Sequence, residues 1–268
     1  MFVLTILYAS LLVGGEPRAP TQSVRLFNGR DLAGWTTWLV DSREKDPRGV
    51  YSVHDGVLRI SGDGFGYLAT EHPWRDYRLV VEFRWGKQQH EKRRRNARDS
   101  GIFLHAVGPD GNSYDGHGAY KAAIECQVMQ GAVGDLLLIK GRDERGQDVP
   151  VEITGRVRNK SDRDGWHWWD PRGESLRTKR TGRRNWLDKD ANWKDALDFR
   201  GRRDVESPRD EWTRVECVCR GESLAVSVNG KLVNQATKVC PAAGQILLQC
   251  EGSEVFFRRV ELFPLNEK

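Results

Sequence analysis

Hydrophobic and polar positions alternate over many short runs of this chain. A period of two predicts half-buried β-strands, because successive side chains of a strand point to opposite faces of its sheet. Clusters of Gly, Asp, Asn and Pro separate the runs and predict turns. The predicted strands are residues 56–62, 77–85, 100–108, 121–129, 213–221, 223–236, 244–252 and 255–265.

Asn229-Gly230 stands between two alternating runs, where this dipeptide is a strong signal for a tight hairpin. Many short strands with turns between them and few helical stretches are typical of an antiparallel sandwich or jelly roll. The chain has 268 residues, of which 38% are hydrophobic, enough for one large β domain or two small ones. We expect an all-β protein with one antiparallel β-sandwich domain over residues 21–268.

Residues 155–208 differ from the rest, since they are polar, basic and rich in Trp without a sustained apolar period. We expect a long insertion over one face of the sandwich, and loops of this length are usually functional. Its tryptophans are Trp166, Trp168, Trp169, Trp186 and Trp193. An indole ring can stack on a sugar, so we select Trp166 and Trp168 as candidate sugar contacts. The alternative for each tryptophan is that it anchors the insertion onto the domain.

The first 20 residues contain an apolar run from Phe2 to Val13, followed by small residues, glycine and proline. The run is shorter than the roughly 20 apolar residues that cross a bilayer, and it suits a signal peptide. We therefore expect a signal peptide over residues 1–20 and a secreted or periplasmic protein, with a buried first strand as the alternative. No later stretch is apolar enough to predict a transmembrane helix.

The net charge is +5, and much of the basic excess lies in residues 84–98 and 156–203. We expect these runs to be solvated loops rather than sites for nucleic acid or acidic glycans. The five cysteines are too few and too irregularly spaced for a disulfide framework, so we expect buried thiols. No CxxC, HExxH or clustered His/Cys spacing indicates a structural zinc site.

Several segments together carry a resemblance to a known family. They are LFNGRDLAGW (26–35), DSGIFLH (99–105), IECQVM (124–129), VNGKLV (228–233) and GQILLQCEGSEVFFRRVEL (244–262). In this order they resemble the 3-keto-disaccharide hydrolase domain family over nearly all of the chain after the leader. The resemblance implies a concanavalin A-like β-sandwich that cleaves glycosides already oxidised to a ketone at C3. The chain departs from the family at Asp99, His105 and Gln130, where Asn, Arg and Asp are common, so its substrate could differ.

The strand at 121–129 carries one carboxylate, Glu125, on its polar face, with Gln127 two residues further on. Ordinary glycoside hydrolysis uses two carboxyl groups roughly 5 to 9 Å apart. A ketone at C3 acidifies the C2 proton, so the substituent at C1 can leave by elimination before water adds. This route needs one base, stabilisation of an enolate and a donor near the leaving oxygen.

Alternation predicts that His105 and Glu125 meet on one open face, because their aliphatic neighbours would face the core. We expect Glu125 or His105 to be the base of a glycoside hydrolase or lyase. The candidate substrate contacts are Gln127, Lys121, Ser100, Asp99, Trp166 and Trp168. A divalent metal could stabilise the enolate, but no ligand spacing requires one, and we assign no metal ligand. The alternatives are a non-catalytic carbohydrate-binding module and a basic protein that binds acidic polymer; the oligomeric state stays open.

Overall fold

The computed structural model describes residues 15–114 and 117–265. Most of the predicted signal peptide at residues 1–20, including its apolar run from Phe2 to Val13, lies outside these residues. Within the described part, the one helix is a short 3-10 helix, η1 (Glu91–Arg94). No helix there has the length and hydrophobicity to cross a membrane. Strands therefore make the fold.

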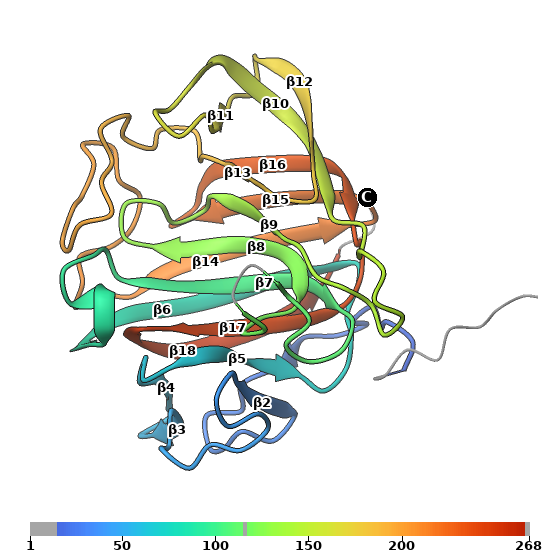
Figure 1. The fold of residues 1–268 in the computed structure, drawn as a ribbon, viewed down its shortest axis with the longest axis vertical. Helices are drawn as coiled ribbons and strands as arrows, with labels where there is room; N and C mark the ends of the chain where they lie inside the picture. The colour runs from blue at the N-terminus through green and yellow to red at the C-terminus, as the bar shows by residue number, and fades with distance from the viewer. Residues whose placement is uncertain (1–14, 115–116, 266–268) are drawn as a thin grey trace, which may run out of the picture.

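The strands form two antiparallel sheets that overlie one another (Figure 1). The larger sheet, counted over the described residues, contains β1 (Val24–Arg25), β3 (Tyr51–His54), β4 (Val57–Ile60), β6 (Tyr77–Gln89), β10 (Glu152–Ser161), β11 (His167–Trp169), β12 (Glu174–Lys179), β14 (Thr213–Arg220), β15 (Ser223–Val228), β16 (Lys231–Cys240) and β18 (Ser253–Pro264). Its order is β11-β10-β16-β15-β14-β6-β18-β4-β3, with β1 beside β18 and β12 beside β10.

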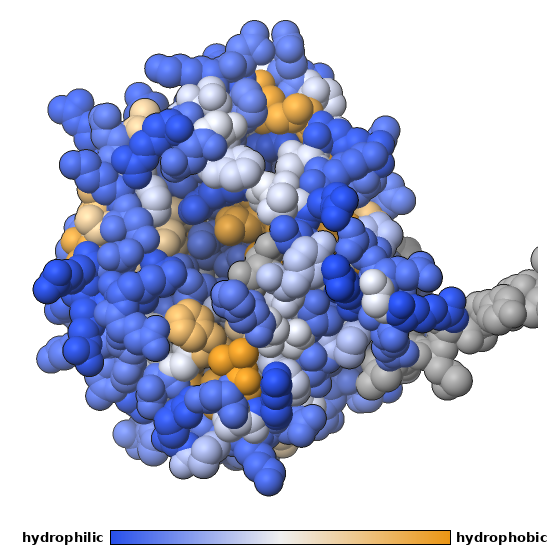
Figure 2. Space-filling view, viewed as in Figure 1, coloured by the Kyte–Doolittle hydropathy of each residue, from blue (hydrophilic) through white to orange (hydrophobic). Residues whose placement is uncertain are grey.

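The smaller sheet contains β2 (Trp35–Leu39), β5 (Phe65–Thr70), β7 (Asp99–Val107), β8 (Ala122–Met129), β9 (Leu136–Ile139), β13 (Gly182–Arg184) and β17 (Gln245–Glu251). Its order is β13-β9-β8-β7-β17-β5-β2. We call the face of this sheet that points away from the other sheet the outer face. The outer face is turned toward the viewer in Figure 1, and the same view as a surface is hollowed near its middle (Figure 2).

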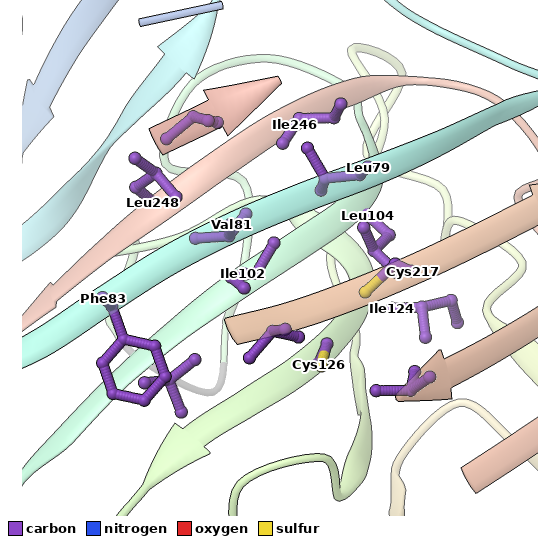
Figure 3. Packing of buried hydrophobic residues seen from close by; sticks show 14 of the residues in the cluster. Leu79, Val81, Phe83, Ile102, Leu104, Ile124, Cys126, Cys217, Ile246 and Leu248 are labelled. Atoms are coloured by element: carbon purple, nitrogen blue, oxygen red, sulfur yellow. The ribbon is translucent and has the colours of Figure 1, made fainter. Parts of the chain in front are cut away.

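A hydrophobic core fills the space between the sheets. Leu104 of β7 and Ile124 of β8 lie in one cluster with Leu79 of β6 and Cys217 of β14, and all four side chains are buried (Figure 3). Full burial of an aliphatic side chain of this size contributes about 1.5 to 3 kcal/mol. Two antiparallel sheets packed in this way confirm the predicted β-sandwich class.

The predicted strands with clear alternation all appear. Asn229 and Gly230 join β15 to β16 with φ of 47° and 81°, the pair of positive values that a type I′ hairpin turn needs. The predicted turn is therefore confirmed.

Residues 155–208 are not the long loop that their composition predicts. They contain most of β10, all of β11 and β12, which extend the larger sheet, and β13, which pairs with β9 at the edge of the smaller one. In β12 one face is exposed and the other is only half-buried, at Leu176 and Thr178, so its sequence shows no clear apolar alternation. Backbone pairing with β10 holds it in the sheet. Residues 185–208 form no strand.

Candidate functional site

Glu125 lies on the outer face, because its neighbours in β8, Ile124 and Cys126, enter the core. Its carboxyl group lies over Gly101 of β7, where an added Cβ would stand 2.4 Å from Glu125 Oε1 and 2.9 Å from Gln249 Oε1. Only glycine leaves this space to the two side chains. Glu125 is 2% exposed, and its Oε1 has no hydrogen-bond partner.

Three acidic side chains, Asp99, Glu125 and Glu251, form what we call the carboxyl cluster. Burial raises the pKa of Glu125 well above its usual range, the charges of Asp99 and Glu251 raise it further, and Arg183 lowers it. Burial and the charge of Glu251 likewise raise the pKa of Asp99, against the opposing charges of Arg93 and Arg183. A carboxyl group with a raised pKa is a stronger base once deprotonated, which suits proton transfer.

Glu251, at the end of β17, holds the side chains around it. One of its oxygens accepts hydrogen bonds from the Tyr120 hydroxyl and from Gln249 Nε2, each at 2.9 Å. The other accepts from Arg93 Nη2 at 2.6 Å, and the same nitrogen contacts Asp99 Oδ2. The cluster is thus fixed by hydrogen bonds at one end, while Glu125 at the other end keeps an unpaired oxygen.

Other buried polar atoms around Glu125 also lack a partner. They are Asp99 Oδ1, Gln127 Oε1, Gln249 Oε1 and Arg183 Nη2. Buried polar groups are nearly always hydrogen-bonded in native proteins, and the exceptions concentrate at functional sites. Acceptors and a cation that gather around one carboxyl group can bind the hydroxyls and the carbonyl oxygen of a ligand.

The insertion supplies the cation Arg183. β13 places Arg183 opposite Leu137 of β9, and Leu137 stands opposite Glu125 of β8, so the three side chains share the outer face. Arg183 Nε donates to Asp135 Oδ2 at 2.6 Å, and the same oxygen accepts from Lys189 Nζ at 2.7 Å. Asp135 is fully buried, so it fixes the insertion to the sheet and orients the guanidinium.

Arg93 corrects the prediction for the basic run at 84–98. The first part of the run belongs to β6, and Arg93 in η1 is only 3% exposed because it inserts among Asp99, Glu251 and Asp195. A run that reads as a solvated loop therefore contributes a buried cation to the carboxyl cluster.

The prediction that His105 meets Glu125 on the open face is wrong. Between Leu104 and Val107, two residues of β7 stand opposite one residue of β8, which is a β-bulge. His105 sits in the bulge with φ of 57°, and its ring packs edge-on against Tyr77 in the core with centroids 5.7 Å apart. Burial lowers its pKa to about 4. The His105 ring points into the core, on the other side of the sheet from Glu125, so a substrate on the outer face does not reach it.

Two further candidates lie away from Glu125. Ser100 faces the opposite side of β7 from its neighbours, is fully buried, and donates to the backbone carbonyl of Gln249 at 2.9 Å, so it is not a substrate contact. Lys121 precedes β8 and donates to Gln245 Oε1 at 2.7 Å, with Asp110 at 3.5 Å. It stands roughly 13 Å along the strand direction from the site carboxylate. Asp99 and Gln127 are brought to the site.

Trp168 anchors the insertion, as the alternative interpretation had it. It is 4% exposed, and its Nε1 donates to the backbone carbonyl of Lys189 at 3.0 Å, so Trp168 is not free to stack on a sugar. Two more tryptophans of the insertion, Trp169 and Trp186, are buried as well. Trp166 is half-buried and lines a cavity of about 50 Å³ with Trp193 and Arg183.

The sequence analysis missed Gln249 and Glu251, although the signal was present. Both alternate with core-facing Leu248 and Cys250 in β17, in the same way that selected Glu125 in β8. Arg93 and Arg183 had no local signal, because tertiary contacts decide their burial. Among residues 15–114 and 117–265, no three His, Cys, Asp or Glu side chains are arranged to hold a metal ion.

Comparison with known proteins shows which family the chain belongs to. No curated protein matches the chain in sequence. A structure from Parabacteroides distasonis named "putative glycosyl hydrolase" is 16% identical, with a TM-score of 0.50 over 91% of this chain and 94% of the other, and shows the fold alone. A second structure of that name and organism is 15% identical, with a TM-score of 0.49 over 91% and 100%.

A Bacillus licheniformis β-glucanase is 10% identical, with a TM-score of 0.44 over 91% of this chain and 99% of the other. One family model matches residues 22–262, a range that includes the carboxyl cluster and strands of both sheets. The chain belongs to the family of the 3-keto-alpha-glucoside-1,2-lyase-like domain.

Proposed function

We propose that the protein is a carbohydrate-active enzyme that cleaves 3-keto-glycosides, with Glu125 as the base. The observation that carries the proposal is the buried Glu125 carboxyl group, whose Oε1 is unpaired above the glycine floor of the outer face. Family membership supports carbohydrate as the substrate class. Arg93 binds both Asp99 and Glu251 and does not bind Glu125, whereas a hydrolase of unoxidised glycosides uses two carboxyl groups at a defined separation.

In the proposed reaction the substrate ring lies against the outer face with its C2 proton toward Glu125. Glu125 takes that proton, the electrons of the C2–H bond pass into an enolate, and the C1–O bond then breaks with its electrons going to the leaving oxygen. The leaving oxygen takes up a proton, and water adds across the new C1–C2 double bond. Arg183, with its unpaired Nη2, is placed to stabilise the enolate oxygen.

The experiment is an assay of purified protein on 4-nitrophenyl 3-keto-glucoside, with and without a chelator, beside the unoxidised 4-nitrophenyl glucoside. We expect release of nitrophenol from the keto substrate and none from the parent glucoside. Glu125→Gln keeps the shape of the side chain and should lower kcat/KM about 10²-fold or more. Glu216→Gln, on the larger sheet, is the matched control and should keep the wild-type rate.

Binding of native sugar without turnover of any keto-glycoside would contradict the proposal and favour the carbohydrate-binding module. A near wild-type rate of Glu125→Gln would contradict the assignment of the base. A rate that falls with chelator and returns with added divalent cation would assign the enolate stabilisation to a metal rather than to Arg183.

We also propose that the protein is exported, on the strength of its N-terminal sequence pattern. The apolar run within residues 1–20 precedes small residues, as before a signal-peptidase site. Protein recovered from the cell envelope of its native host should begin near residues 15–22. An intact Met1 on that material would contradict export by this route.

A further inference from the structure

The larger sheet also has a side that points away from the core, and this side is turned away from the viewer in Figure 1. Its central strands β14, β6 and β18, with β1 beside β18, carry many arginines there. We call this surface the arginine face. It consists of Arg25, Arg78, Arg84, Arg214, Arg258 and Arg259, with Glu82, Glu216 and Glu261 between them.

Strand register places these side chains on one surface. Glu82 of β6 stands opposite Arg214 of β14 and Arg259 of β18. A β-bulge in β18 lies between Phe257 and Arg259, so two successive arginines point outward. Both reach Glu82, since Arg258 Nε donates to Oε2 at 2.6 Å and Arg259 Nη1 lies 3.7 Å from Oε1.

The glutamates of the arginine face lie below the arginines. Their side chains are 12–22% exposed, whereas the side chains of the five arginines that contact them are 33–79% exposed. A guanidinium group has five N–H donors, and a carboxylate accepts at most two of them in a bidentate pair. A molecule that approaches this side therefore meets cations with N–H donors to spare, which favours an anionic partner.

Aromatic rings hold some of these arginines in place. The Arg84 guanidinium lies 4.9 Å from the ring centroid of Trp212 and 5.4 Å from that of Phe256. The Arg258 guanidinium lies 4.7 Å from the same Trp212 ring. Arg84 Nε is buried without a hydrogen-bond partner. Side chains that are already ordered by cation–π contacts lose less entropy when a ligand binds.

The arginine face is hollowed at one end by a cavity of about 310 Å³. Its lining consists mainly of Arg25, Arg258 and Arg259, the glutamates below them, Phe27 and Asn28. Cavities of this size hold a small ligand or one ring of a longer one. The cavity therefore suits a ring that carries an acid group.

Among polyanions, an acidic polysaccharide fits this surface best. Duplex DNA carries one charge per 1.7 Å of its axis, a density that would place phosphates over the glutamates as well as over the arginines. A chain of sugar acids separates its carboxylates by neutral hydroxyls, and those hydroxyls can donate to the glutamates. Membership of a carbohydrate-active family agrees with a sugar polymer.

We propose that the arginine face binds an acidic polysaccharide built of uronic acids and places one of its rings in the cavity beside Arg258 and Arg259. The arginine face and Glu125 lie on opposite sides of the sandwich, so the bound polymer leaves the carboxyl cluster open. Binding holds the protein on an acidic matrix and involves no turnover. It goes beyond the proposed function and does not depend on it.

The test measures binding of polygalacturonate to immobilised protein by biolayer interferometry, with neutral dextran as the control polymer. Wild type should bind polygalacturonate, more weakly as salt rises, and should not bind dextran. Arg258→Gln combined with Arg259→Gln should weaken binding about tenfold or more, and Arg84→Gln should weaken it as well. Arg177→Gln is the matched control, because Arg177 is an exposed arginine paired with Glu152 elsewhere on the sheet, and it should bind as wild type does.

Binding and catalysis are measured separately. Glu125→Gln should bind polygalacturonate as wild type does, and the Arg258→Gln, Arg259→Gln double variant should keep its rate on 4-nitrophenyl 3-keto-glucoside. A wild-type protein that binds the polymer but turns over no keto-glycoside contradicts only the proposed function.

Three results would overturn the assignment of the arginine face. One is a wild-type protein that does not bind polygalacturonate at low salt. Another is an equal loss of binding in Arg177→Gln and in the double variant, which would show a general effect of charge. The third is tighter binding of duplex DNA than of polygalacturonate through Arg258 and Arg259, which would make the partner a nucleic acid.

Discussion

Replacing Gly101 with Ala should disable the site by displacing the Glu125 carboxyl group, although the substitution removes no functional side chain. The new Cβ would lie 2.4 Å from Glu125 Oε1 and 3.0 Å from its Cδ, whereas ordinary contact begins near 3.4 Å. The carboxyl group must therefore move by about 1 Å. A displacement of this size can lower a catalytic rate about 10²-fold.

The same substitution has a calculable effect on stability. Gly101 is not among the residues with positive φ, so Ala can adopt its backbone. Replacing Gly in a strand gains about 0.5 to 1 kcal/mol, and overpacking against Glu125 costs about 1 to 3 kcal/mol. The net destabilisation is therefore at most about 2.5 kcal/mol, small enough for most single domains to stay folded.

The assay measures kcat/KM on 4-nitrophenyl 3-keto-glucoside and unfolding in urea for Gly101→Ala, Glu125→Ala and the double variant. In the Glu125→Ala background the clash with the Glu125 carboxyl group is removed and the contact with Gln249 Oε1 at 2.9 Å stays, so Gly101→Ala should cost less there by about 1 kcal/mol or more. Ser100→Ala, on the opposite face of β7, should keep its activity. The reasoning is refuted if Gly101→Ala retains full activity, or if its cost is the same in both backgrounds.

The other predictions concern pH and His105. If Glu125 is the base, the acid limb of the kcat/KM profile should lie above the ordinary carboxyl range. Asp99→Asn should move this limb to lower pH and Arg183→Gln should move it to higher pH; shifts of both variants in the same direction would contradict this electrostatic account. The pKa of Glu125 is higher in the folded state than in the unfolded state. Its contribution to stability is therefore full below the unfolded-state pKa and is lost as pH rises through the folded-state pKa. The Tm of Glu125→Gln minus the Tm of wild type should accordingly rise from pH 5 to pH 8. His105→Asn, which tolerates the positive φ, should lower Tm but leave kcat/KM near wild type; a large loss of rate at unchanged Tm would return His105 to the site.

Period-two alternation correctly predicted which side chains of a strand point away from the core. The run at 121–129 has aliphatic residues at every second position, so the outward direction of Glu125 follows once those residues are buried. The same argument holds for Gln249 and Glu251 at 244–252. It fails at His105, because one extra residue in β7 reverses the faces after Leu104 and no local pattern announces the bulge.

The same alternation does not predict which long charged side chains become buried. Arg93 and Arg183 lie in segments whose composition predicts solvated loops, and each is drawn inward by a carboxylate that is distant in sequence: Glu251 for Arg93, Asp135 for Arg183. Only the pairing of strands brings these groups together. Local sequence therefore predicted Asp99 and Glu125 and held the signal for Glu251, but it gave no sign of Arg93 or Arg183.

The acidic residues of the site are easier to predict than the basic ones because the two kinds come from different parts of the fold. The smaller sheet places Asp99, Glu125 and Glu251 on one face, where their mutual repulsion and burial raise the cost of ionisation. The cations that balance this charge come from other segments: Arg93 from η1, and Arg183 from the edge strand of the insertion. The basic excess of those two segments thus includes Arg93 and Arg183, whose charges offset the buried carboxyl groups. We therefore expect the insertion to be needed for the proton affinity of Glu125 as well as for the fold.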